Sequence, residues 1–382
     1  MSGGSGIPKC RDMIRTLEIQ NFKSLAKCNI SHLARVNLIV GKNNVGKSSL
    51  LEALSLLFAD GSPRRIHELL AERGLTAYFR SVAANERDEL MVKALSSLYT
   101  GRDAAAFKEL PISVSAEAED GKMMRVMLRL GFVIRNYGRQ ANTLDFDVPA
   151  DSGVDIADDV RFYPGLFVNT AEKEHFYRFS DRGLLPPFRD VSEGGARCRF
   201  VRPSSVHSVD NALLFDGIAM TGLQQNLVGA LNIIDPRIRD VNFLNDPMSL
   251  KSERVPIVVL DGDDTRYQLQ SMGDGVNRIL TIVLSMLNSK GGVLLVDEFE
   301  NGLHYTALCR LWEMIFRLSE ELGVQVFVTS HSDDCIKSFI KADVKGEGAL
   351  LRLESRNNGV IGVPYTDRDE LNYIRDNDVE VR

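Results

Sequence analysis

The chain has 382 residues, 44% hydrophobic and 26% charged, a composition typical of one folded core enlarged by an insertion or a second lobe. Its formal net charge of −6 argues against a globally basic protein that coats nucleic acid, although a local basic patch is compatible with it. No apolar run is long enough to span a bilayer, no secretory signal pattern opens the chain and the five cysteines form no CxxC pair, so we expect a cytoplasmic protein with free thiols and no membrane contact.

The beginning of the chain predicts a strand, a glycine-rich turn and a helix in close succession. Residues 13–20 alternate as a strand does, and the branched apolar run 36–40 ends at a glycine. Residues 48–58 carry apolar side chains at helical spacing. A buried strand is therefore expected to lead through a turn directly into a helix.

The middle of the chain is expected to form a lobe of helices and strands. Residues 64–108 are charged and helical in pattern, whereas residues 111–148 alternate at period two, as antiparallel strands do. Residues 150–210, rich in Gly, Pro, Arg and Asp, give no clear pattern, and residues 211–234 look helical.

The last third of the chain alternates strands with helices. The expected elements are strands at about 255–260 and 265–269, a helix at 273–287, a strand at 293–296, a helix at 304–321, a strand at 324–329 and a helix from 332. Such alternation predicts a parallel sheet and hence an α/β fold. We expect the residues after His331, whose acids are Asp367, Asp369, Glu370, Asp376, Asp378 and Glu380, to form a solvated C-terminal helix and charged tail.

The segment GKNNVGKS, residues 41–48, matches the phosphate-loop pattern G-x-x-x-x-G-K-[ST]. Glycines let backbone N–H groups point at a phosphate from the start of a helix. Lys47 is expected to reach the β- and γ-phosphates of ATP, and the Ser48 hydroxyl to bind Mg²⁺. The nucleotide-binding residues expected on this basis are Gly41, Asn43, Asn44, Gly46, Lys47, Ser48 and Ser49.

Acidic and histidine side chains follow the next two apolar strands. Asp297 is expected to support Mg²⁺, and the adjacent Glu298 to orient and deprotonate an attacking water. His331, which follows residues 324–329, can hydrogen-bond a γ-phosphate and sense its loss. The alternatives are that Asp297 and Glu298 are simply two exposed acids at the end of a strand, and that His331 has only a structural role.

The segment SMGDG, residues 271–275, opens a helix shortly before the acidic strand. Small residues at a helix start suit an anion. Because the phosphate loop already cradles the nucleotide of its own chain, this second segment is expected to serve the nucleotide of another copy. The alternative is an ordinary glycine-rich helix entry.

Taken together, these motifs resemble those of the ABC-type AAA ATPases: RecF, the heads of structural-maintenance-of-chromosomes (SMC) proteins and, most closely, the OLD (overcoming lysogenization defect) group. The similar segments are LEIQNFKSL, VNLIVGKNNVGKSSLLEAL, SMGDGVNRIL, LLVDEFENGLH and VFVTSHS. The resemblance implies a P-loop NTPase fold with an ABC-type head, a mixed sheet, an antiparallel β-subdomain and a helical insertion. It covers only the two ends of the chain and suggests ATPase lobes at 1–60 and 251–382, with an inserted lobe at 61–250.

The resemblance also implies a role for each matching residue. The implied set is Glu298 as catalytic base, His331 as switch, Ser48 and Asp297 at the metal, Lys23 at the nucleotide, Ser271, Gly273 and Gly275 at the nucleotide of the opposite copy, and Asn301 to His304 as the D-loop at the dimer seam. The family's Q-loop glutamine has no clear counterpart; Gln140 is available, but its setting differs.

The implied function is that of an ATPase subunit that senses a signal and controls a separately encoded effector. The resemblance suggests anti-phage defence, a homodimer or higher homo-oligomer, and a Toprim-type nuclease as effector, because no strand framework for a Toprim domain is expected after His331. The alternative is a RecF-like DNA-binding repair protein. Its candidate basic patch is RCRFVR, with Arg197, Arg199 and Arg202, which could equally be a strand with an exposed charged face. The absence of LSGGQ argues against a transporter ATPase.

Overall fold

The computed structural model describes residues 13–75, 84–136, 146–149, 162–180, 183–184, 198–203, 208–246, 253–356, 359–377, 379 and 381. A 14-stranded sheet runs through the whole molecule. In spatial order its strands are β10 (Cys198–Val201), β14 (Val293–Val296), β15 (Gln325–Thr329), β3 (Val36–Gly41), β16 (Gly348–Arg356), β17 (Gly359–Tyr365), β2 (Leu25–Ile30), β1 (Ile14–Phe22), β4 (Ile112–Ala118), β5 (Met123–Asn136), β7 (Phe162–Thr170), β8 (Glu174–Ser180) and β9 (Gly183–Leu184), with β6 (Phe146–Pro149) paired to β5.

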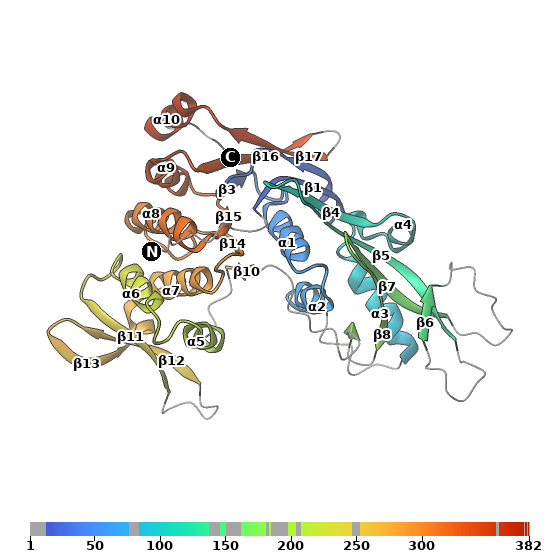
Figure 1. Ribbon diagram of the computed structural model, residues 1–382, viewed down its shortest axis with the longest axis horizontal. Helices are drawn as coiled ribbons and strands as arrows, with labels where there is room; N and C mark the ends of the chain where they lie inside the picture. Colours follow the sequence, from blue (N-terminus) through green and yellow to red (C-terminus); the bar gives the residue numbers. More distant parts are fainter. Residues whose placement is uncertain are drawn as a thin grey trace, which may run out of the picture.

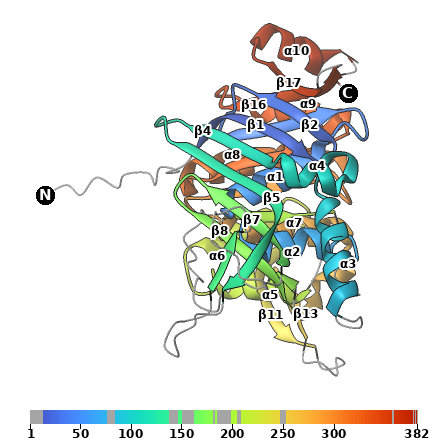
Figure 2. The same ribbon diagram turned by 90° about the vertical axis from the view of Figure 1, so that its right-hand side faces the viewer.

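The sheet has a parallel half and an antiparallel half. From β10 to β16 all neighbouring strands are parallel, whereas β1, β4, β5, β7 and β8 form an antiparallel meander that begins at the β1–β2 hairpin. The meander projects from the molecule as an arm, with α3 (Ala84–Ser96) and α4 (Ala104–Glu109) along its side (Figures 1 and 2). A separate three-stranded sheet holds β11 (Ile238–Asn245), β12 (Arg254–Leu260) and β13 (Asp263–Gln268).

Helices cover both faces of the parallel half. On one face lie α5 (Ser208–Asp216), α6 (Leu223–Leu231), α7 (Asp274–Leu287), α8 (Tyr305–Leu322), α9 (Asp333–Ala342) and α10 (Arg368–Asp376); on the other lie α1 (Lys47–Phe58) and α2 (Pro63–Ala71) (Figure 1). Two short 3₁₀ turns, η1 (Thr100–Arg102) and η2 (Leu269–Met272), complete the element order.

Strand alternation explains why the sheet has two cores. In β3, Leu38 and Val40 join the core under α7 and α8, and Ile39 joins the core under α1. Each core holds large aromatic side chains: Trp312 of α8 and Phe58 of α1 are almost wholly buried, and each such side chain contributes roughly 2–3 kcal/mol of burial free energy. The ends of the parallel strands are therefore rigidly placed.

The expected fold class is confirmed: an α/β fold with a mixed sheet, an antiparallel β-extension and added helices. The strand at 293–296 has the expected bounds, and those of β3, α1, α7, α8 and β15 differ from expectation by one residue. The stretch at 211–234 is two helices rather than one, with a break around Gly217, where the side chain of Asn288 leaves no room for a β-carbon. The segment 150–210 holds β7 to β10, and β11 was not expected.

The expectation of a solvated C-terminal tail is wrong. Strands β16 and β17 belong to the main sheet, and β16 lies directly beside the central strand β3. Leu350 and Leu351 of β16 are buried in opposite cores, so the first half of this strand is interior, whereas its last residues are exposed. In the described part of the chain, α10 is the helix that follows, packed through Leu371 and Ile374.

Other expectations are not decided by the fold. The division at residues 60 and 250 stays a prediction, since the middle segment shares the main sheet with both flanking ones. Gln140 and Arg197 lie outside the described residues. Within the described part of the chain, no helix has the length and apolarity to cross a membrane.

Candidate active site

The turn between β3 and α1 needs both of its glycines. Gly41 has φ +143°, and a β-carbon there would lie 2.8 Å from the carbonyl oxygen of Leu353 on β16. Gly46 has φ +111° and precedes α1; its β-carbon would lie 2.6 Å from the side chain of Leu25. Close approach of neighbouring strands thus fixes the loop in the conformation that the glycines permit.

This loop presents hydrogen-bond donors to a cavity. Gly46 provides no side-chain cap for α1, so the first backbone N–H groups of the helix are available to a ligand. Lys47 Nζ donates to the carbonyl oxygens of Gly41 (2.6 Å) and Lys42 (3.2 Å). Partial burial lowers the pKa of Lys47, while Asp297, Glu300 and Glu298 oppose that shift. The loop is therefore a suitable anion cradle.

Asp297 and Glu298 follow β14 on the opposite side of the cavity. Asp297 is 8% exposed, and its Oδ1 accepts a 2.5 Å hydrogen bond from Thr329 Oγ1. The same hydroxyl accepts the backbone N–H of Glu298 (2.9 Å). Glu298 adopts φ +49°, a left-handed conformation that costs a non-glycine residue energy. Strand β15 thus fixes the turn that carries both carboxylates.

His331 is held by a carboxylate that the sequence did not single out. Glu300 Oε1 accepts the backbone N–H of His331 (2.8 Å) and lies 2.9 Å from its ring Nδ1. Glu300 is largely buried, and among the described residues its Oε2 has no hydrogen-bond partner. Glu300 therefore orients the histidine at the cavity edge.

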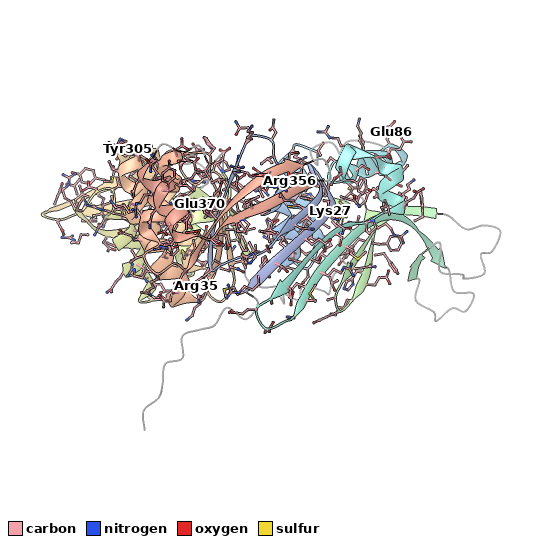
Figure 3. The ribbon with its side chains drawn as sticks, turned by 90° about the horizontal axis from the view of Figure 1, so that it is seen from above. Lys27, Arg35, Glu86, Tyr305, Arg356 and Glu370 are labelled. Carbon is pink, nitrogen blue, oxygen red and sulfur yellow. The ribbon has the colours of Figure 1, made fainter. Side chains whose placement is uncertain are left out.

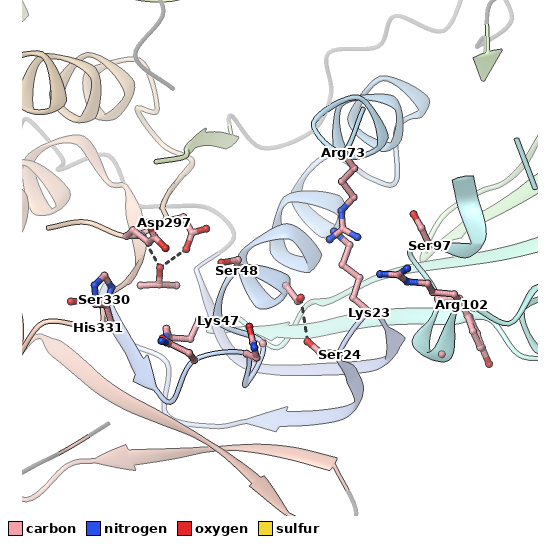
Figure 4. Close-up of a pocket in the computed structure, with 18 residues that line it drawn as sticks. Lys23, Ser24, Lys47, Ser48, Arg73, Ser97, Arg102, Asp297, Ser330 and His331 are labelled. Atoms are coloured by element: carbon pink, nitrogen blue, oxygen red, sulfur yellow. Dashed lines mark hydrogen bonds between the residues drawn. The ribbon is translucent and has the colours of Figure 1, made fainter. Parts of the chain in front are cut away.

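These side chains line one cavity of about 1010 Å³, at the upper end of the range for ligand pockets (Figure 4). It brings together most of the expected site residues: Lys23, Asn43, Asn44, Gly46, Lys47, Ser48, Ser49, Asp297, Glu298 and His331. Gly41 shapes the loop from behind without lining the cavity. Ser48 and Asp297, one hydroxyl and one carboxylate, form a donor set that fits Mg²⁺ when phosphate and water oxygens supply the remaining ligands.

Lys23 lines this cavity, but its amino group is occupied. Lys23 Nζ donates to the Glu52 carboxylate of α1 in a buried ion pair. Burial lowers the pKa of Lys23 to about 8, and the charge of Glu52 only partly offsets this. Lys23 thus ties the β1–β2 turn to the helix that carries the phosphate loop.

The cavity extends to a wall that the sequence did not predict, formed by Arg73, Ser97, Tyr99, Gly101 and Arg102. Arg102 belongs to η1 and has φ +58°. Figure 4 shows its guanidinium directed toward Lys23 and Arg73. The only sequence signal was a glycine followed by an arginine in a segment expected to be helical.

The segment around Ser271 does not line this cavity. Ser271 is exposed and donates to the Gln268 carbonyl oxygen (2.7 Å), and Gly273 has φ +101° just before α7. A β-carbon on Gly275 would lie 2.8 Å from the carbonyl oxygen of Gly302. The segment 271–275 and the expected D-loop segment 301–304 therefore contact each other, and the cavity at the phosphate loop is lined by neither.

The end of the D-loop segment lies at the surface. His304 precedes α8, and its Nδ1 lies 2.8 Å from Thr306 Oγ1. The next residue, Tyr305, is 61% exposed at the periphery of the molecule (Figure 3). Neither His304 nor Asn301 lines the cavity.

The candidate basic patch on β10 is partly internal. Arg202 forms an ion pair with Glu72 and lies 3.9 Å from Glu52, so its charge is compensated inside the fold. Arg199 is exposed. The described part of this segment is therefore a strand of the main sheet with one outward arginine.

Two family models match the chain. Residues 13–125 match the family described as "AAA ATPase domain", and residues 161–334 match the one described as "AAA domain, putative AbiEii toxin, Type IV TA system". The two matched regions contain the phosphate loop and the acidic strand respectively. They support an ATPase of the AAA type with a nucleotide site.

Individual proteins are similar to this chain at low identity. An "ATP/GTP phosphatase" of Helicobacter pylori is 23% identical over 345 residues, which cover 85% of this chain and 87% of that protein. A "DNA replication and repair protein RecF" of Saccharophagus degradans is 25% identical over 134 residues, 35% of this chain and 36% of that protein. The SMC head domain from Thermotoga maritima has 12% identity and a TM-score of 0.47, covering 92% of this chain and 99% of that one.

Proposed function

We propose that this AAA-type ATPase hydrolyses ATP at the cavity between α1 and β14, and that two copies associate around the bound nucleotide. The observation that carries the proposal is the distribution of the site residues. Lys47, Asp297 and Glu298 line one cavity, whereas Ser271 and Gly273 lie outside it. A second copy that brings its Ser271 segment to this cavity would complete the ring of donors around the γ-phosphate.

The chemistry follows from the groups that line the cavity. Lys47 and the first N–H groups of α1 hold the phosphates, and Ser48 and Asp297 hold Mg²⁺, which when bound neutralises charge on the phosphoryl oxygens. Glu298 orients the attacking water and accepts its proton. His331, oriented by Glu300, contacts the γ-phosphate and registers its loss.

We further propose that ATP-dependent association controls a separately encoded effector in anti-phage defence, with a Toprim-type nuclease as the effector. The motif resemblance to the OLD group supports this role. One matched family is named for a toxin of a toxin–antitoxin system, which supports a function exercised together with a second protein. Purifying the chain with its chromosomal neighbours, with and without ATP, tests it; recovery of no partner in either condition would contradict it.

The molar mass of Glu298→Gln in solution, with and without Mg-ATP, tests association. We expect ATP to raise the mass of this variant, because the nucleotide binds and persists. Lys47→Ala is the matched control, since it loses the phosphate ligand and should ignore ATP. A Glu298→Gln mass that is the same with and without Mg-ATP would overturn ATP-gated association.

A RecF-like repair protein is the second candidate, favoured by the similarity to the protein named RecF. It predicts DNA binding that strengthens with ATP and weakens steeply with salt. Fluorescence anisotropy with duplex DNA, at low and moderate salt, measures both. Binding that ATP does not change would remove this candidate.

A further inference from the structure

Arg278, on the second turn of α7, is a buried arginine whose contacts converge on the catalytic turn. It is 2% exposed. Its Nη2 donates to the carbonyl oxygens of Asp297 (2.7 Å) and Glu298 (3.1 Å), and its Nη1 donates to the carbonyl oxygen of Arg202 (2.5 Å). One guanidinium thus joins α7 to the ends of the adjacent parallel strands β10 and β14.

These bonds hold the Glu298 backbone from one side, and Thr329 holds it from the other. The Glu298 N–H donates to Thr329 Oγ1 and its carbonyl oxygen accepts from Arg278, while its φ of +49° is a conformation that requires such support. Loss of the contact with either Arg278 or Thr329 would let the Glu298 backbone relax, and the Glu298 carboxylate would then move within the cavity.

The same face of α7 also contacts the segment that follows Glu298. Gly275 and Arg278 are three residues apart and therefore share a helix face. Gly275 packs so closely on Gly302 that a β-carbon would lie 2.8 Å from the Gly302 carbonyl oxygen. Helix α7, which begins just after Ser271 and Gly273, therefore contacts the 297–302 turn near both of its ends.

We propose that Arg278 is a positioning residue that transmits the placement of α7 to Glu298, so that hydrolysis proceeds at full rate only when the Ser271 segment is engaged by the nucleotide of the other copy. The inference deepens the proposed function and rests on it. The rigid fork of arginine suits the role because it reaches three carbonyl oxygens at once, which a lysine ammonium on a flexible stem does not reproduce.

The test compares Arg278→Met and Arg278→Lys with wild type, by steady-state hydrolysis and by ATP-dependent molar mass. We expect association with Mg-ATP to be retained and KM to change little. We expect kcat to fall about 100-fold for Arg278→Met, since a small displacement of a reacting group costs that much, and about tenfold for Arg278→Lys. Wild-type kcat in both variants, or loss of ATP-dependent association in both, would overturn the proposal.

The matched control is Thr281→Val on the same helix. It removes another buried hydrogen bond, from Asn211 Nδ2 to Thr281 Oγ1 (2.9 Å), away from the catalytic turn. We expect a lower melting temperature with kcat unchanged. A kcat loss in Thr281→Val as large as that in Arg278→Met would mean that Arg278 acts through general stability, and would also overturn the proposal.

A double variant provides a readout that a structural role would not change. If Arg278 acts through Glu298, adding Arg278→Lys to Glu298→Gln should not slow single-turnover hydrolysis further, whereas independent effects multiply. Multiplication of the two effects rejects the inference and leaves the proposed function intact. Wild-type turnover in Glu298→Gln alone rejects the proposed function itself.

Discussion

The buried pair of Lys23 and Glu52 makes stability depend on pH in an unusual direction. Burial lowers the pKa of Lys23 from 10.5 to about 8. The unfolded chain therefore binds one more proton than the folded chain between these values, and the unfolding free energy should rise there with pH, by up to about 1.4 kcal/mol per pH unit. Below pH 8 the cost of burying the charged lysine is fully present.

Denaturant unfolding of wild type and Lys23→Met across this pH range measures the effect. The stability difference, wild type minus variant, should increase from pH 8 to 10.5. Lys27→Met, an exposed lysine on β2 (Figure 3), is the control and should show no such trend. A difference that stays constant with pH would show that Lys23 keeps an ordinary pKa.

Thr329 gives a second prediction at the scale of single side chains. Thr329→Val keeps the shape of the side chain but removes the hydroxyl that joins Asp297 Oδ1 to the Glu298 N–H. We expect weaker Mg²⁺ activation, about a tenfold lower kcat and a stability loss of about 1–2 kcal/mol, because a buried N–H loses its partner. Thr329→Ser keeps the hydroxyl and should behave like wild type; an Mg²⁺ titration of hydrolysis distinguishes them.

Sequence reasoning found the site residues that belong to a local pattern. The phosphate loop, Asp297, Glu298 and His331 each follow an apolar strand directly, and the sheet brings those strand ends together. Arg278 was missed because its partners are main-chain groups distant in sequence, which leave no mark on spacing, and Glu300 was missed because His331, its partner, follows a different strand. Arg102 was missed because its left-handed turn interrupts a segment of helical composition.

The 3₁₀ turn η1 brings the base of the arm to the nucleotide cavity, and a further prediction concerns its residue Arg102. Arg102 lines the same cavity as Lys47 and Ser48, on the wall that it forms with Arg73, and we propose that this wall contacts ATP. We expect Arg102→Ala and Arg102→Gly to weaken ATP binding about tenfold alike, the loss of one charged hydrogen bond. Isothermal titration with Mg-ATP measures it.

The two variants separate binding from backbone strain. Glycine accepts φ +58° freely, so Arg102→Gly should be more stable than Arg102→Ala by roughly 1 kcal/mol while binding equally poorly. Arg64→Ala, an exposed arginine of α2 outside the cavity lining, should bind ATP normally. Unchanged affinity in both Arg102 variants would exclude this wall from the nucleotide site.

Helices and strands were predictable where their own residues show a hydrophobic period. They were not predictable where pairing with a strand distant in sequence determines the structure. Strands β3, β14 and β15 are short runs of branched residues buried on both faces, and they were expected at nearly their true positions. Strand β16 was mistaken for tail because charged residues follow its apolar start, Ala349 to Leu351. Its position beside β3, some three hundred residues earlier in the chain, is decided by tertiary strand pairing and not by the residues of β16 alone.

At the scale of the whole molecule, a site shared between two copies predicts recovery of activity on mixing inactive variants. Lys47→Ala disables the phosphate loop of its own chain, and Ser271→Ala disables the segment proposed to serve the other chain. A mixed dimer then contains one site with both changes and one site with neither. With equal amounts of the two chains, the mixture should recover hydrolysis up to about half of the wild-type rate, because each mixed dimer holds one intact site of two.

The control for this mixing experiment uses two changes in one cavity. Lys47 and Glu298 line the same cavity of the same chain, so every site in a mixture of Lys47→Ala with Glu298→Gln retains one of the two defects. That mixture should stay inactive at every ratio. Recovery of hydrolysis in the first mixture alone would mean that Ser271 of one chain acts at the Lys47 site of the other. Inactivity of both mixtures would contradict a shared site and would mean that the exposed Ser271 segment does not act on the nucleotide of a second copy.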